Sequence, residues 1–216
     1  MAGGLWSLAP SMVPVFVISL PNSNRRPEIT RHLNEHNIPF EFWNGHLVED
    51  RSSSQYGQST LNSGTLGCLI AYLDLYRHIA LKKIPLALIL EDDVICNPQV
   101  DFGRLEFSKI FEMTQSDYCF LHCYPCGPCG TQGQLVSLKA AELLDAERSA
   151  ILATDAPIDL ILWEQRTASL SELRVEDLYK RLDLWLFKHA HQYDDANNSE
   201  RMQLNWLHQK TVMDHK

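Results

Sequence analysis

Apolar runs alternate with amphipathic stretches along the first half of the chain. Residues 14–20 are a β-branched run, and residues 27–37 begin with proline and carry apolar side chains at helical spacing. Residues 38–46 return to a pattern typical of a strand. A strand, a helix and a second strand in this order make a βαβ unit, which indicates a parallel sheet.

The same alternation continues further along the chain. Residues 65–83 place apolar side chains on one helical face, and residues 85–94 begin with a solid apolar run typical of a strand buried on both faces. Beyond them the pattern predicts a helix, a strand, and a short strand joined to an Ala/Leu-rich helix at residues 130–147. The sequence therefore predicts an α/β fold with a mostly parallel central sheet flanked by helices.

Residues 169–190 have the pattern of a long amphipathic helix. Ser169 and Glu172 have the spacing of a capping box, and apolar side chains recur on one face with basic residues beside them. We expect this helix and the polar tail to form a segment of residues 169–216, packed on a main domain of residues 1–168. Peripheral contact with a membrane is the alternative, although acidic residues within the helix oppose adsorption to anionic lipid.

Composition excludes several classes of protein. A chain of 216 residues with 45% hydrophobic side chains suits one domain with a real core. Its formal net charge of −8 opposes binding to nucleic acid. Neither a membrane span nor a signal peptide is indicated by the sequence, so we expect a cytoplasmic protein, with the inner face of the membrane as an alternative location.

Four of the six cysteines crowd into one short stretch. Cys119, Cys123, Cys126 and Cys129 surround His122, and this spacing could hold zinc or an iron–sulfur cluster. A zinc site normally joins two separated ligand pairs. We therefore favour the other interpretation, a Gly/Pro-rich loop with free thiols.

Three carboxylates follow directly after the apolar run of residues 86–90. Glu91, Asp92 and Asp93 repel one another, and in open α/β sheets ligands bind at the carboxyl ends of strands. Mg²⁺ or Mn²⁺ prefers oxygen ligands and keeps room for phosphate oxygens. The cluster therefore predicts a divalent-cation site that receives a diphosphate; a solvated acidic turn is the alternative.

Several segments in order resemble glycosyltransferase family 25, the lipooligosaccharide and procollagen galactosyltransferase group. The matching stretches between residues 14 and 165 are "VFVISLPNSNRRPEITRHL", "FEFWNG", "GTLGCLIAYLDLYRHI", "PLALILEDDV", "GTQGQLVSLKAAELL" and "APIDLIL". The chain departs from the family at Thr65, where Glu is common, and at Ala71 and Tyr72, where Ser-His is common. Gln134 stands where an aromatic residue is usual.

The resemblance implies a GT-A fold and the inverting transfer of a hexose, galactose or glucose, from a UDP-sugar to a hydroxyl of a glycan, lipooligosaccharide or protein. It implies Mn²⁺ or Mg²⁺ held by Asp93 and Glu91, with Asp92 as an orienting group and His191 as a third ligand. For His191 the alternative is a place on the polar face of the terminal helix. Asp159 is the expected base for the acceptor hydroxyl, with a helix N-cap as its alternative.

The donor pocket implied by the resemblance includes residues from several loops. Arg25 and Arg26 are expected to contact the diphosphate or the nucleotide, unless they are surface arginines at a helix start. The other expected donor-binding residues are Ser19, Leu20, Gly45 and Gly64. Two further classes stay open: a catalytically degenerate relative that only binds nucleotide sugars, and a metal-binding protein organised by the cysteines.

Overall fold

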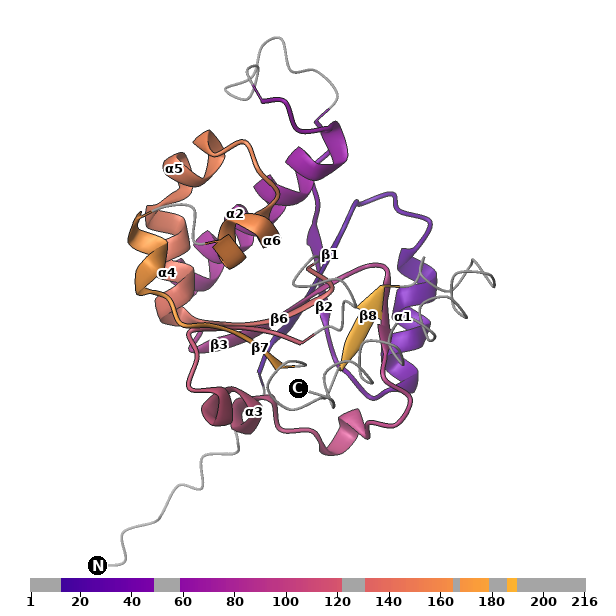
Figure 1. The fold of residues 1–216 in the computed structure, drawn as a ribbon. Coiled ribbons are helices and arrows are strands. Elements are labelled where there is room, and N and C mark those ends of the chain that lie inside the picture. Colours follow the sequence, from indigo (N-terminus) through magenta and orange to yellow (C-terminus); the bar gives the residue numbers. More distant parts are fainter. Residues whose placement is uncertain (1–12, 49–58, 122–130, 165–167, 179–185, 190–216) are drawn as a thin grey trace, which may run out of the picture.

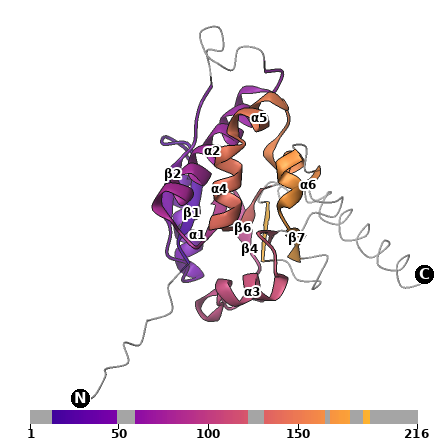
Figure 2. The same ribbon diagram turned by 90° about the vertical axis from the view of Figure 1, so that its left-hand side faces the viewer.

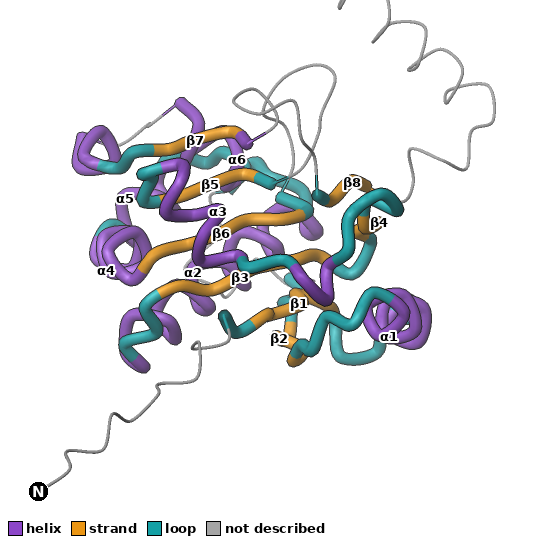
Figure 3. Tube along the Cα trace, turned by 90° about the horizontal axis from the view of Figure 1, so that it is seen from below, coloured by secondary structure: helices purple, strands orange, loops and turns teal. Residues whose placement is uncertain are grey.

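The computed structural model describes residues 13–48, 59–121, 131–164, 168–178 and 186–189. Its centre is a six-stranded mixed sheet with the strand order β2-β1-β3-β6-β5-β7 (Figure 3). Two further strands pair with each other in a separate antiparallel ribbon. The main strands are β1 Val15–Ser19, β2 Glu41–Asn44, β3 Leu86–Glu91, β5 Tyr118–Phe120, β6 Gly133–Ser137 and β7 Val175–Asp177, and the ribbon is β4 Val94–Cys96 with β8 Phe187–His189.

Strand directions decide which ends of the strands meet. β1 lies between β2 and β3 and is parallel to both, and β5 is parallel to β7. β6 is antiparallel to its neighbours β3 and β5. The predicted α/β fold with a mostly parallel sheet is confirmed, and β6 brings its N-terminal end to the edge where β1, β2 and β3 end.

Helices cover both faces of the sheet (Figure 1). Helices α2, α4, α5 and α6 lie over one face, and α1 and α3 lie over the other (Figure 2). The described helices are α1 Arg26–Glu35, α2 Ser63–Lys82, α3 Phe107–Thr114, α4 Leu138–Ala146, α5 Arg148–Ala153 and α6 Ile158–Glu164, with 3₁₀ turns at Phe102–Arg104 and Ala168–Glu172.

The solid apolar runs in the sequence come from strands that are buried on both faces. In β1, Phe16 and Ile18 enter the core under α2 and α4, whereas Val15 and Val17 enter the core under α1 and α3. Strand β3 alternates in the same way. A central strand with helices on both faces has no solvated side and so needs no polar alternation.

Local signals fix the ends of the longest helix, α2. The side chain of Asn62 accepts a hydrogen bond of 2.8 Å from the backbone N–H of Thr65, which caps the first turn. The helix ends at Lys83, whose φ of 55° lies in the left-handed region. The cap lies before the predicted start of the helix at residue 65.

The prediction of one long helix over residues 169–190 is wrong. The described part of this stretch is a 3₁₀ turn, strand β7 in the main sheet, and strand β8 paired with β4. Leu178, Leu186 and Phe187 are buried in the core under α1 and α3. Strand pairing with β5 satisfies the backbone of Val175–Asp177, so tertiary contacts override the helical periodicity.

The division of the chain at residue 168 stays a prediction, although β7 and β8 contribute strands and core residues from beyond it. Within the described residues, no helix combines the length and the apolar character that a membrane span requires.

Candidate active site

A pocket of about 700 Å³ lies where β1, β2 and β3 end. Parallel strands place their carboxyl ends at one edge of the sheet, and the loops that follow supply polar side chains there. The pocket brings together most of the residues that the sequence predicts for a donor site. These are Ser19, Leu20, Arg25, Gly45, Gly64, Glu91, Asp92 and Asp93.

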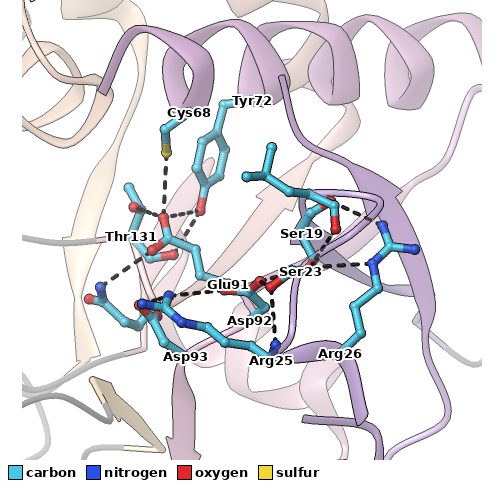
Figure 4. A network of polar contacts seen from close by, with 12 residues as sticks. Ser19, Ser23, Arg25, Arg26, Cys68, Tyr72, Glu91, Asp92, Asp93 and Thr131 are labelled. Atoms are coloured by element: carbon cyan, nitrogen blue, oxygen red, sulfur yellow. Dashed lines mark hydrogen bonds and ion pairs between the residues drawn. The ribbon is translucent and has the colours of Figure 1, made fainter. Parts of the chain in front are cut away.

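Asp92 is held by side chains from the segment that follows β1 (Figure 4). Its Oδ2 accepts hydrogen bonds from Ser19 Oγ at 2.7 Å and from Ser23 Oγ at 2.9 Å. Its Oδ1 lies 3.3 Å from a guanidinium nitrogen of Arg25. These contacts join the turn after β3 to the loop that leads into α1, and they orient Asp92.

Arg25 compensates the charge of the two aspartates. The same guanidinium nitrogen lies 3.1 Å from Asp93 Oδ2. The side chain of Arg25 is 40% exposed, whereas those of Asp93 and Asp92 are 10% and 14% exposed. A shielded pair of carboxylates needs a nearby cation, and within this structure Arg25 supplies that charge.

Arg26 holds the ends of β1 and β2 together. Its guanidinium donates to the backbone carbonyl of Ser19 at 3.1 Å and to Asn44 Oδ1 at 2.8 Å, and it lies 4.4 Å from the centre of the Phe42 ring. Arg26 is not among the described residues that line the pocket. Its contacts therefore position the neighbouring strand ends.

Glu91 points away from the two aspartates and toward α2 and β6 (Figure 4). Its Oε1 accepts hydrogen bonds from Tyr72 OH at 3.1 Å, from Thr131 Oγ1, and from Cys68 Sγ at 3.7 Å. Gln132 Nε2 donates to Oε2 at 3.5 Å. The three carboxylates of the acidic run thus separate into two differently partnered groups.

The donors around Glu91 are neutral. Burial, together with the charge of Glu91, raises the pKa of the Tyr72 hydroxyl well above its usual value. Burial and the same carboxylate raise the pKa of the Cys68 thiol. A thiol that keeps its proton is a hydrogen-bond donor and a weak nucleophile, so the cysteine in this pocket is unsuited to covalent catalysis.

A buried polar network continues behind Tyr72. Gln134 is fully buried, accepts a hydrogen bond from Tyr118 OH, and donates to the backbone carbonyl of Thr131 at 3.3 Å. Tyr72 OH lies 2.8 Å from the same carbonyl oxygen, so this carbonyl and Glu91 Oε1 share the single hydroxyl proton of Tyr72. Tyr72 and Gln134, two positions at which the sequence departs from the family pattern, therefore meet at one backbone group.

The other departures lie apart from this network. Ala71 is fully buried, and its backbone carbonyl accepts a hydrogen bond of 3.2 Å from Trp43 Nε1 in β2. Thr65 lies in the first turn of α2, where its N–H is capped by Asn62.

The predicted metal ligands fit a divalent cation in part. Glu91 and Asp93, two of the predicted ligands, line the pocket together with Asp92, the predicted orienting group, and carboxylate oxygens are the donor type that Mn²⁺ and Mg²⁺ prefer. Within the described residues, the side chains of Glu91, Asp92 and Asp93 do not bring three carboxylate oxygens, one from each, within 4.8 Å of one another. His191 lies outside the described residues, so its role stays a prediction.

Asp159, the predicted base, lies in the first turn of α6. It is not among the described residues that line the pocket. The neighbouring α6 residues Ile158 and Ile161 are buried in the core under α2 and α4, and the charge of Asp159 contributes to the raised pKa values of Cys68 and Tyr118.

Sequence reasoning missed several residues of the site. Ser23, His46, Cys68 and Gly67 line the pocket, and Thr131 binds Glu91. Ser23 stands in the polar stretch between the first strand and the paired arginines, which is a usable signal. The others come from loops and a helix whose contact with β3 depends on the tertiary fold.

The cysteine-rich stretch is described only at its start. Cys119 is buried in β5, and the described cysteines, Cys68, Cys96 and Cys119, are free thiols. Residues 122–130 lie outside the described residues, so both interpretations of Cys123, Cys126 and Cys129 stay open.

Comparison with known proteins points to one family. Residues 12–122 match the sequence model described as "Glycosyltransferase family 25 (LPS biosynthesis protein)". No curated protein matches the chain.

Two solved structures resemble the fold. A glycosyltransferase involved in the glycosylation of the major capsid of PBCV-1 is 12% identical, with a TM-score of 0.49 over 89% of this chain and 98% of that one. A197 from STIV is 16% identical, with a TM-score of 0.35 over 68% of this chain and 79% of that one.

Proposed function

The chain belongs to glycosyltransferase family 25 and is a glycosyltransferase, and from this premise we propose that it transfers a hexose from a UDP-sugar, with inversion, to a hydroxyl of a glycan, lipooligosaccharide or protein. Galactose and glucose are the proposed sugars. The observation that supports this most is the pocket at the ends of β1, β2 and β3, since its described lining residues lie inside the region that matches the family.

Arg25 is the proposed contact of the donor diphosphate. It faces the pocket at the start of α1, where the backbone N–H groups of a helix of ten residues also favour an anion. A guanidinium forms paired hydrogen bonds with phosphate oxygens. Arg26 supports this arrangement by holding Ser19 and Asn44, the last residues of β1 and β2.

Asp93 and Asp92 would hold Mn²⁺ or Mg²⁺. When bound, the cation would neutralise charge on the departing diphosphate as a Lewis acid. Asp92 is oriented by Ser19 and Ser23, which prepares one carboxylate for this role. Glu91 would contribute less, because its Oε1 is turned toward Tyr72, Thr131 and Cys68 and away from the two aspartates.

Asp159 remains the proposed base that takes the proton of the acceptor hydroxyl. The lone pairs of Glu91 Oε1 are occupied by Tyr72, Thr131 and Cys68, so Glu91 is better suited to form a fixed wall of the pocket. Asp159→Asn and Glu91→Gln separate the two roles. Loss of transfer with retained UDP affinity in Asp159→Asn supports the assignment, and unchanged transfer in that variant would move the role elsewhere.

A donor screen tests the function. Release of nucleotide from UDP-galactose, UDP-glucose, UDP-N-acetylglucosamine and GDP-mannose is measured with Mn²⁺, with Mg²⁺ and with EDTA. Metal-dependent release from one UDP-hexose is the expected result. Calorimetric binding of UDP without any release would instead support the binding-only relative, and release from GDP-mannose alone would contradict the proposed donor class.

A further inference from the structure

A group of three metal-binding side chains lies apart from the pocket. His32 and His36 stand four residues apart in α1, so they share one face of the helix, and Cys96 ends strand β4. One ligand atom from each lies within 4.8 Å of the other two. The imidazole rings of His32 and His36 are 4.9 Å apart, and helix α1 packs beside β4 (Figure 3).

We propose that His32, His36 and Cys96 bind Zn²⁺ and that the ion fastens helix α1 to strand β4. Two imidazoles and one thiolate are a ligand set that zinc accepts, with a water in the fourth position. Zn–N and Zn–S bonds of about 2.0–2.3 Å place tetrahedral ligand atoms roughly 3.3–3.7 Å apart. Ligand atoms that lie within 4.8 Å of one another therefore need to close by at most about 1–1.5 Å.

The local contacts favour ligation. His32 Nε2 accepts a hydrogen bond of 2.9 Å from the backbone N–H of Cys96, which brings the imidazole next to the residue that supplies the thiol; zinc bound at Nε2 would replace this hydrogen bond. Binding would release the proton of the Cys96 thiol to solvent, leaving a zinc-bound thiolate.

The position of the group gives the ion a structural role. Helix α1 begins next to Arg25 and Arg26, and β4 begins directly after Asp93. Both elements therefore start directly after pocket residues, Arg25 and Asp93, and meet again at His32, His36 and Cys96. A bond between them at that point would restrain the two segments that carry the Arg25–Asp92–Asp93 contacts.

Metal analysis of the full-length, untagged chain tests the proposal. The background variant carries serine at Cys123, Cys126 and Cys129, because thiols in that stretch could bind zinc themselves. After EDTA treatment and equilibration with Zn²⁺, about one equivalent of zinc should remain, and the melting temperature should rise by several degrees over the metal-free protein. Co²⁺ in place of Zn²⁺ should give a thiolate-to-cobalt charge-transfer band.

Matched variants identify the ligands. His36→Gln should weaken Zn²⁺ binding by at least about tenfold and remove the metal-dependent rise in melting temperature. His78→Gln is the control, since His78 also contacts aromatic rings, those of Phe16 and Trp43, and is not a member of the proposed site. Asp93→Asn should retain the zinc, which separates this site from the pocket.

Three results would overturn the proposal. They are retention of well under half an equivalent of zinc, unchanged zinc binding in His36→Gln, and a cobalt complex without the thiolate band in a protein that melts normally.

Discussion

Asp92 and Asp93 show how neighbouring acidic residues become compatible with a partly buried site. Arg25 bridges both carboxylates, and Ser19 and Ser23 donate to Asp92. Glu91, the residue before them, turns to the opposite side of the strand end and is satisfied by Tyr72 and its neighbours. Glu91 is the last residue of β3, whereas Asp92 and Asp93 lie in the turn that follows, so the change from strand to turn separates the two groups of carboxylates.

The assignment of Asp93 predicts a large loss of transfer in Asp93→Asn. Removing its charge takes away a ligand of the proposed cation. It also removes one of the two ion pairs that Arg25 makes in the pocket. We expect turnover to fall about 10²–10³-fold, the usual cost of removing one electrostatic contact with a departing group. Steady-state nucleotide release measures it, and thermal melting checks the fold.

Asp101→Asn is the matched control for that variant. Asp101 is 64% exposed and pairs only loosely with Arg104 at 3.3 Å, so its neutralisation should leave turnover within about twofold. Full metal-dependent turnover by Asp93→Asn would remove Asp93 from the site.

Asp155 links the segment before α6 to residues 59–60, and we expect this link to be sensitive to acid. Hydrogen bonds from Ser59 Oγ, Thr60 Oγ1 and the backbone N–H of Thr60 lower its pKa to about 2. A folded-state pKa below the unfolded value adds stability above about pH 4, and that stability is lost as the pH falls through about 2. The melting temperature of Asp155→Asn should therefore lie below that of the wild type at pH 6, and the two should converge near pH 2. A difference that stays constant down to pH 2 would contradict the link.

At the scale of elements, helix α2 and the segment after β2 approach each other at Gly67. A Cβ atom on Gly67 would lie 2.1 Å from the backbone carbonyl oxygen of His46, which is too close for any side chain. Gly67→Ala should force the two segments apart at a cost of about 1–3 kcal/mol in unfolding free energy. Since His46 and Gly67 both line the pocket, the affinity for UDP should fall as well.

Gly64→Ala, one turn earlier in the same helix, provides the comparison. The nearest atom to a Cβ there is Asn62 Oδ1 at 3.4 Å, so alanine should stabilise the helix by about 0.5–1 kcal/mol. Urea unfolding and UDP calorimetry measure both variants. Equal stability of the two variants would show that the close approach at Gly67 relaxes without cost.

The sequence was sufficient for most elements and for one side of the site. Apolar runs and helical spacing located β1, α1, β2, α2 and β3. The end of an apolar strand indicated a site at Asp92 and Asp93, and the family resemblance added Ser19 and Arg25 to it. It was insufficient where distant segments meet. Thr131 reaches Glu91 because β6 runs antiparallel to β3, and Tyr72 reaches it because α2 packs on the sheet; no local pattern encodes either arrangement.

The prediction of a helix over residues 169–190 was wrong for a related reason. Residues 175–189 contain apolar side chains at spacings compatible with a helix, but the described ends of this stretch pair as strands with β5 and β4. A partner strand outweighs a weak helical preference, and the identity of that partner becomes visible only in the assembled sheet.

At the scale of the molecule, Phe187 closes the core under α1 and α3. It is fully buried, packs against Gly133 of β6, and its ring lies 5.4 Å from that of Phe102. Phe187→Ala should lower the free energy of unfolding by about 3–5 kcal/mol, because it leaves a cavity between the sheet and the β4–β8 ribbon. Urea unfolding measures the loss.

Leu81→Ala is the control for Phe187→Ala. Leu81 is 70% exposed, so its loss should change stability by no more than about 0.5 kcal/mol. A loss below about 1 kcal/mol in Phe187→Ala would mean that the C-terminal strand adds little to the core.

The two edge strands of the main sheet, β2 and β7, bear on the association of one molecule with another. The described sheet ends at β2 and β7, strands of four and three residues that carry Glu41 on one edge and Glu176 and Asp177 on the other. Backbone groups at such edges can recruit strands from a second molecule, and short strands with like charges discourage this. With a net charge of −8 at pH 7, concentrated protein should remain dispersed near neutrality, and colloidal repulsion should vanish as the pH approaches 5.5, the isoelectric point.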